Sequence, residues 1–204
     1  MASQFFDWIS IASNLFGQST NRIIWNLFLA VIPFILSFYL FRSSATRSIF
    51  WWLTLSIFIA FLPNAPYILT DSIHIIELSQ YYPRWAIVFV LIPQYMVFIV
   101  AGFEAYIISL IRLDRYLTNL VAPKYIVASN AIAHGLCVIG IYLGRFERFN
   151  SWDFVTKPTL VLARTIQDLF NGWKLLSMAI AFLLIWLLSE FMKLVNRKAL
   201  NSNN

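Results

Sequence analysis

Long stretches without a charged side chain alternate with short polar segments along this chain. The stretches that lack Asp, Glu, Lys and Arg are residues 23–41, 48–70, 85–103, 125–144 and 175–189. A helix of about 20 apolar residues crosses the hydrocarbon core of a bilayer. Because backbone polar groups in lipid must find partners within the chain, these segments are expected to be helical. The pattern therefore predicts an all-α fold, a polytopic transmembrane helical bundle with about five spans.

The apolar pattern also predicts where these spans lie. Allowing for polar flanks, the predicted spans cover residues 23–41, 48–63, 85–107, 125–144 and 174–193. Pro33 and Pro93 fall inside two of them and are expected to bend the helices there. No internal repeat or low-complexity linker interrupts the chain, so residues 1–204 are predicted to form a single multi-pass membrane domain.

The segments outside the spans carry weaker predictions. Residues 1–20 could form a short helix that lies in the membrane interface. The pattern after residue 70 predicts another short helix that begins near Thr70 or Asp71. Residues 158–171 read as an amphipathic helix that Gly172 would end. The polar residues 199–204 are expected to be a disordered tail.

Composition and charge agree with a membrane protein and argue against a soluble domain or a nucleic-acid-binding protein. Apolar residues make up 60% of the chain and charged residues 12%, whereas roughly a quarter of the residues of a soluble domain are charged. The net charge of +6 reads as electrostatic attraction to the membrane surface, so no nucleic-acid partner is expected. The single cysteine excludes a disulfide within the chain. The lipid bilayer is the expected partner.

Polar residues concentrate in two clusters, residues 63–77 and 144–153, each at the end of an apolar run. Four of the nine acidic residues lie in them: Asp71, Glu77, Glu147 and Asp153. Between the ends of these two runs the chain crosses the membrane once in each direction. Both clusters are therefore expected on the same membrane face. Leaving out Arg145 and Arg148, eight basic residues on the opposite face against five on this face favour an outward-facing position for the clusters.

The first cluster combines imidazole and carboxylate groups. Asp71, His74 and Glu77 are three residues apart, so on a helix each neighbours the next. Such a set suits proton transfer or metal ligation, or it is only a helix cap with locally bonded neighbours. Upstream, the prolines that flank Asn64 predict a non-helical stretch. Because irregular backbone at membrane depth needs cover from protein or water, a polar cavity is expected there.

The second cluster contains two guanidinium groups among short hydrogen-bonding side chains. Arg145 and Arg148 could present paired donors to a phosphate or carboxylate, and lipid headgroups are the nearest phosphates. Alternatively, these arginines pair with acidic residues of the first cluster or with Asp153 and hold the bundle together. Asn150 could cap a turn that Asp153 supports. Neither cluster shows the spacing of a known cysteine metal site or a phosphate-binding glycine loop.

Two further ionisable groups lie within predicted spans. His134 is in the middle of its span, one turn after Asn130, and Glu104 lies near the end of another. Ionisable groups at such positions usually face the interior of a bundle. A proton relay and a neutral histidine with a local hydrogen bond are the two interpretations.

The residues of both clusters resemble the hallmarks of one family, the bacterial integral-membrane family known as domain of unknown function 1361. Its hallmarks are an NAPY–TD–H segment and a GIYLGRF–R–NSWD segment. The chain has NAPY at 64–67, Thr70, Asp71 and His74, then GIYLGRF at 140–146, Arg148 and NSWD at 150–153. The resemblance implies a small multi-pass protein of the cell membrane and supplies no reaction.

Three hypotheses for function follow. In the first, the clusters bind or modify a lipid headgroup or another small anion; in the second, they are structural braces or a docking surface without enzymatic activity. In the third, the protein is a small transporter whose polar centre includes His134. The catalytic candidates are Asp71 and His74, and the candidates for substrate binding are Asn64, Arg145, Arg148, Asn150 and Asp153. Whether the protein is an enzyme, and whether it uses a metal or cofactor, stays open.

Overall fold

The computed structural model describes residues 2–42, 47–150 and 152–201, and these residues form helices without strands. The longer helices are α1 (Ala2–Leu40), α2 (Ile49–Phe61), α6 (Ile92–Thr118), α7 (Pro123–Arg145), α9 (Pro158–Leu169) and α10 (Gly172–Asn201). The short elements are α3 (Asn64–Tyr67), the 3₁₀ helix η1 (Ile68–Ser72), α4 (Ile73–Ser79), α5 (Arg84–Ala86), the π-helical turn η2 (Ile87–Leu91) and α8 (Asp153–Thr156).

Five helical stretches within the described residues are long and apolar enough to cross a membrane. They are Phe6–Leu40, Ile49–Ser79, Arg84–Thr118, Pro123–Arg145 and Gly172–Asn196. The predicted all-α fold with about five membrane-spanning helices is therefore confirmed.

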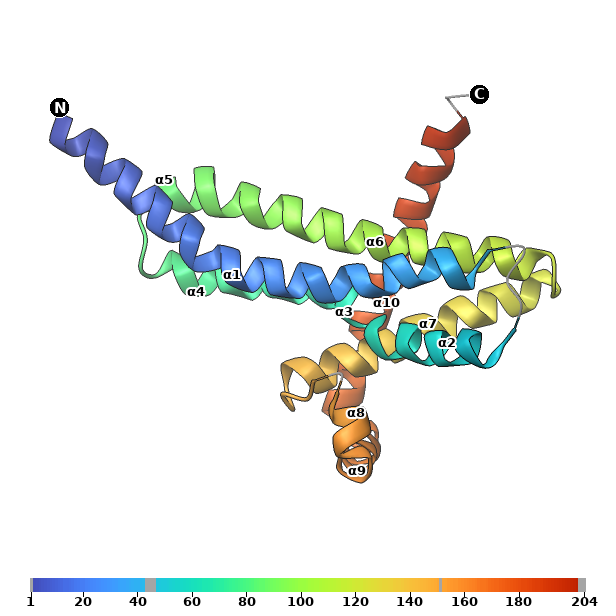
Figure 1. The fold of residues 1–204 in the computed structure, drawn as a ribbon. Helices are drawn as coiled ribbons and strands as arrows, with labels where there is room; N and C mark the ends of the chain where they lie inside the picture. Colours follow the sequence, from blue (N-terminus) through green and yellow to red (C-terminus); the bar gives the residue numbers. More distant parts are fainter. Residues whose placement is uncertain (1, 43–46, 151, 202–204) are drawn as a thin grey trace.

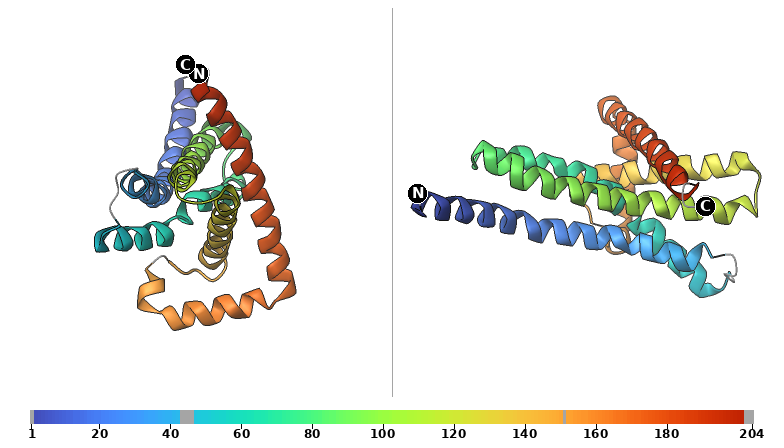
Figure 2. Two further views of the ribbon diagram at one scale, coloured as in Figure 1. Left: turned by 90° about the vertical axis from the view of Figure 1, so that its right-hand side faces the viewer. Right: turned by 90° about the horizontal axis from the view of Figure 1, so that it is seen from above.

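The helices are arranged as a bundle with one crossing member (Figure 1). α1 packs lengthwise against α6, the segment from α2 to α4 runs back along them, and α7 returns only as far as the middle of the bundle. Two further views show α10 crossing the others steeply rather than running beside them (Figure 2). Its contacts are with α6, α7 and α9. The buried core includes the large side chains Phe58, Ile68, Tyr95, Phe98 and Tyr106.

α1 is longer than its apolar pattern predicts. Residues 2–40 form one helix, so the segment proposed to lie in the interface is continuous with the first span. The polar residues near the junction do not end the helix because their side chains bond along it. The hydroxyl of Thr20 donates to the carbonyl of Phe16, and the hydroxyl of Ser19 lies 3.1 Å from the carbonyls of Leu15 and Phe16. Such back-bonding satisfies a polar side chain without opening the backbone.

The prediction of a non-helical stretch around Asn64 was wrong. Pro63 has helical dihedral angles (φ −61°, ψ −24°), and α3 begins at the next residue. Pro66 falls within the first turn of this helix, where its missing N–H has no partner to lose. The chain then tightens into η1 before α4 starts at Ile73, slightly later than the predicted helix start.

The other local predictions have mixed outcomes. α9 matches the predicted amphipathic helix, but Gly172 begins α10 instead of ending α9. The π-helical turn η2 directly precedes the helix that contains Pro93, and Pro93 has no N–H to donate to the carbonyl four residues earlier. In the predicted tail, α10 continues through Asn201, and residues 202–204 lie outside the described residues.

Glycines on two helices allow the segment from α3 to η1 to lie close to them. A Cβ atom built on Gly140 of α7 would lie 2.6 Å from Cβ of Pro63, and one on Gly144 would lie 3.2 Å from the ring of Tyr67. On α6, a Cβ atom on Gly102 would overlap the side chain of Ile68. These close approaches bring the first polar cluster against the end of α7, where the second begins.

Candidate functional site

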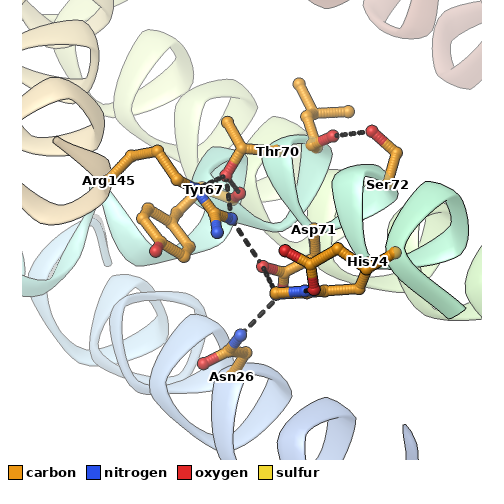
Figure 3. A network of polar contacts seen from close by, with 9 residues as sticks. Asn26, Tyr67, Thr70, Asp71, Ser72, His74 and Arg145 are labelled. Atoms are coloured by element: carbon orange, nitrogen blue, oxygen red, sulfur yellow. Dashed lines mark hydrogen bonds and ion pairs between the residues drawn. The ribbon is translucent and has the colours of Figure 1, made fainter.

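Asp71 joins the two clusters through a buried ion pair (Figure 3). The residue is 2% exposed, and its Oδ1 accepts a hydrogen bond from Nη2 of Arg145 at 2.7 Å. Its Oδ2 accepts from Nδ2 of Asn26 on α1 at 2.6 Å. One carboxylate therefore links η1, α7 and α1.

Arg145 makes further contacts to the first cluster. Its Nε and Nη2 atoms lie 3.1 Å and 2.6 Å from Oγ1 of Thr70 and donate to it. The guanidinium carbon lies 4.7 Å from the centre of the Tyr67 ring, an arrangement that adds a cation–π attraction. We call Asn26, Tyr67, Thr70, Asp71 and Arg145 the polar brace. Its single anion and single cation neutralise each other.

His74 lies beside the brace and points toward two carboxylates. Its Nδ1 is 2.7 Å from Oε2 of Glu77, and its Nε2 is 3.9 Å from Oδ1 of Asp71. Among the residues that the structure describes, no group of three or more His, Cys, Asp and Glu side chains could hold a metal ion. The hypothesis of metal ligation at Asp71, His74 and Glu77 therefore gains no support from this geometry.

A cavity of about 240 Å³ lies between the two clusters, on the side of α7 that carries Gly140 and Gly144. Its wall includes the candidates Asn64, Arg148 and Asn150. The indole rings of Trp25 and Trp152 also line the cavity, and each of these residues is about half exposed. Asp71, His74, Arg145 and Asp153 are not among the described residues that line this cavity.

Arg148 has a special backbone conformation and a different environment from Arg145. Its φ of 58° lies in the left-handed region, and it is the one non-glycine residue with positive φ among the described residues. A residue other than glycine adopts this backbone conformation at a cost of about 1–3 kcal/mol. No ion pair or hydrogen bond to the Arg148 side chain occurs within the described part of the chain. The predicted pair of arginines is thus split, with Arg145 paired and Arg148 facing the cavity.

The predicted turn at the second cluster is present, but the carboxylate of Asp153 closes it. The backbone N–H of Asn150 donates to Oδ2 of Asp153 at 2.7 Å, and the N–H of Asp153 donates to the carbonyl of Asn150 at 2.9 Å. The bond from Asn150, helped by Lys157 at 3.5 Å, lowers the pKa of the Asp153 carboxyl. Ser151, between them, lies outside the described residues.

This lowered pKa predicts a pH dependence of stability. A carboxyl whose pKa is lower in the folded state stabilises the fold fully above its ordinary pKa of about 3.9, and this contribution is lost as the pH falls through the folded pKa. Asp153→Asn should therefore be less stable than the wild type at about pH 6, and the difference should shrink on acidification to about pH 3. Thermal unfolding in detergent checks this, with Asp7→Asn as an exposed control. Equal stability of Asp153→Asn and wild type at neutral pH would contradict the role of the turn.

The structure adds residues that the sequence did not single out. Asn26 supplies a direct hydrogen bond to Asp71, and Tyr67 faces Arg145. Asn26 is the one side-chain amide in the predicted span 23–41, and that is the signal by which it could have been found. Of the candidate residues, Glu77 contacts His74, and the Glu77 side chain is exposed.

The fold and these contacts define a multi-pass helical membrane protein in which a buried ion pair joins the two polar segments. A family model described as "Protein of unknown function (DUF1361)" matches residues 25–188, and the chain belongs to this family. The match includes both polar segments. No curated protein and no solved structure matches the chain.

Proposed function

We propose that the cavity between the two polar segments binds a phosphate-type anion, with Arg148 as its cationic partner. The observation that carries this proposal is the position of Arg148, which lines the cavity with a guanidinium that has no partner among the described residues and with an unfavourable backbone conformation. A residue held in such a conformation by its surroundings is a reasonable candidate for function. A guanidinium also matches the geometry of phosphate oxygens.

The electrostatics of the cavity support the same ligand class. Arg148 is the one charged side chain among its described lining residues. Arg145 does not add a second free cation, because Asp71 neutralises it at 2.7 Å. The site therefore carries about one positive charge, and the amides of Asn64 and Asn150 lie in the same wall.

The aromatic wall favours a lipid headgroup as the source of the phosphate. Trp25 and Trp152 line the cavity, and indole rings concentrate at the headgroup level of membranes. We place the protein in the cell membrane of a bacterium, where phospholipids would supply this group. A free phosphate has the same chemistry, so the experiment must distinguish the two sources.

A second candidate function is a structural component without enzymatic activity. The polar brace favours it, because Asp71 and Arg145 are both occupied by contacts within the chain. In this case Asp71→Asn lowers the yield of folded protein, whereas a catalytic Asp71 would leave a folded and inactive protein. The catalytic roles of Asp71 and His74 stay predictions.

Arg148→Gly tests the anion site without disturbing the backbone, since glycine adopts positive φ without strain. We expect Arg148→Gly to bind phosphatidylglycerol roughly 10–100-fold more weakly than the wild type, because a hydrogen bond to a charged group contributes about 1.5–3 kcal/mol. Arg148→Lys should retain part of the affinity. Native mass spectrometry of the full chain, titrated with phosphatidylglycerol, measures these affinities.

Arg164→Ala, on the exposed face of α9, is the matched control and should bind like the wild type. Inorganic phosphate added as a competitor separates the sources. Full displacement of the lipid at millimolar phosphate indicates a free-anion site, and resistance to displacement indicates recognition of the whole headgroup. Unchanged lipid binding by Arg148→Gly would overturn the proposal.

A further inference from the structure

A second polar network joins α6, α7 and α10 through residues outside the polar brace. Nζ of Lys193 on α10 lies 3.2 Å from Oδ2 of Asp114 on α6 and 3.6 Å from Oε1 of Glu190. Nδ2 of Asn130 on α7 donates to Oδ1 of Asp114 at 2.8 Å. Lys193 is 3% exposed. Two carboxylates thus face one buried ammonium group, which leaves the network with about one negative charge.

A cavity of about 300 Å³ opens beside this network. Its described lining residues include Asn130 and His134 on α7, and Trp186 and Glu190 on α10. Asn130 and His134 are four residues apart, so they lie on the same face of their helix. None of these residues lines the cavity that contains Arg148.

Two buried polar atoms of the lining residues have no hydrogen-bond partner within the described residues. They are Oδ1 of Asn130 and Nε2 of His134, and His134 is 1% exposed. A buried polar atom without a partner costs about 1–3 kcal/mol, so each such atom needs an explanation, and a bound water or ion is one.

The neighbouring contacts define what these two atoms can do. The amide nitrogen of Asn130 is engaged by Asp114, so its oxygen is left as an acceptor; the opposite orientation would place two acceptors against each other. On His134, Nδ1 bonds to the hydroxyl of Tyr106 at 2.6 Å, which leaves Nε2 as the available nitrogen. Depending on its tautomer, Nε2 accepts or donates.

We infer that this cavity is a binding site for a small primary ammonium ion. The amide oxygen of Asn130 and the carboxylate of Glu190 accept hydrogen bonds, and the excess negative charge of the network attracts a cation. His134 supplies a third acceptor in the tautomer whose Nδ1 donates to Tyr106. The ring of Trp186 supplies an aromatic wall of the kind that stabilises ammonium groups. The inference is independent of the proposed anion site.

Methylammonium chloride is the test probe, and isothermal titration calorimetry on the detergent-purified full chain is the measurement. Tetramethylammonium chloride is the matched control ligand because it carries the same charge without an N–H donor. We expect the wild type to bind methylammonium and to bind tetramethylammonium roughly tenfold or more weakly, because the quaternary ion keeps the attraction to the negative charge and to the Trp186 ring but donates no hydrogen bond. Glu190→Gln should weaken binding at least tenfold, and Glu77→Gln, on an exposed carboxylate of the first cluster, should bind within about twofold of the wild type.

A second variant keeps the test decisive if Glu190→Gln disturbs the fold. Val127 lines the cavity from an exposed position, so Val127→Trp should fill the site and abolish binding while the unfolding temperature stays close to that of the wild type. Arg148→Gly should bind methylammonium normally, which separates this site from the anion site. Equal heats for the two ammonium salts on the wild type, or wild-type affinity in the folded Val127→Trp variant, would overturn the inference.

Discussion

Arg145→Ala is expected to lower the free energy of unfolding by about 3–5 kcal/mol, because it leaves the buried carboxylate of Asp71 without its cation. Asp71 is 2% exposed, and among the described residues it keeps the hydrogen bond from Asn26, with Nε2 of His74 3.9 Å from its Oδ1. Asp71→Asn should be milder, since the Arg145 side chain is 20% exposed at the end of α7 and retains Thr70 as a partner. Unfolding followed by circular dichroism in mixed detergent micelles gives these free energies.

The double variant Asp71→Asn/Arg145→Ala separates a charge effect from a loss of packing. If the unpaired carboxylate causes the loss, the double variant is more stable than Arg145→Ala alone. Arg148→Ala is the matched control, and we expect a change within about 0.5 kcal/mol because its guanidinium has no partner among the described residues. A double variant less stable than Arg145→Ala would show that the ion pair is not the reason.

Gly140→Ala is expected to destabilise the protein by about 1–3 kcal/mol relative to Gly135→Ala on the same helix. The new Cβ atom at residue 140 would lie 2.6 Å and 2.8 Å from two ring atoms of Pro63. A proline ring cannot rotate away, so α7 and the α3 segment must separate. The overlap should therefore appear directly as lost stability.

Gly135→Ala is a close control for this prediction. A Cβ atom there meets nothing within 4 Å, and both substitutions gain the same helix propensity, about 1 kcal/mol. Comparing the two variants cancels that gain. Equal unfolding free energies would show that α3 moves away without cost.

The sequence was informative about the fold because charge-free length is a direct physical requirement of a membrane span. It was less informative about which residues of different helices lie at the same height and contact each other. Asn26 contacts Asp71 only because α1 lies beside η1 at that height, and no local pattern encodes this contact. The prolines around Asn64 misled for a related reason, since a proline breaks a helix in its interior and fits its first turn.

The two arginines show that spacing along the sequence does not by itself determine what each side chain contacts. Three residues apart on a continuous helix, they would point in similar directions. α7 ends at Arg145, however, and the backbone reverses at Arg148 with φ 58°. Arg145 consequently faces the first cluster, and Arg148 faces the cavity. The end of a helix, which sequence locates poorly, decides the role of each side chain.

α10 also has a bearing on how the whole molecule sits in its bilayer. Two lysines of α10 pair with carboxylates of other helices, Lys174 with Asp168 and Lys193 with Asp114, and they are 19 residues apart (193 − 174). At 1.5 Å per residue this separation is about 28 Å, close to the hydrocarbon thickness of about 30 Å. The apolar stretch Phe6–Leu40 has 35 residues, or about 52 Å, and fits the same thickness only when strongly inclined. Because α10 crosses the longer helices steeply (Figure 2), α10 and α1 cannot both stand perpendicular to one bilayer, and at least one of them must be inclined to span it.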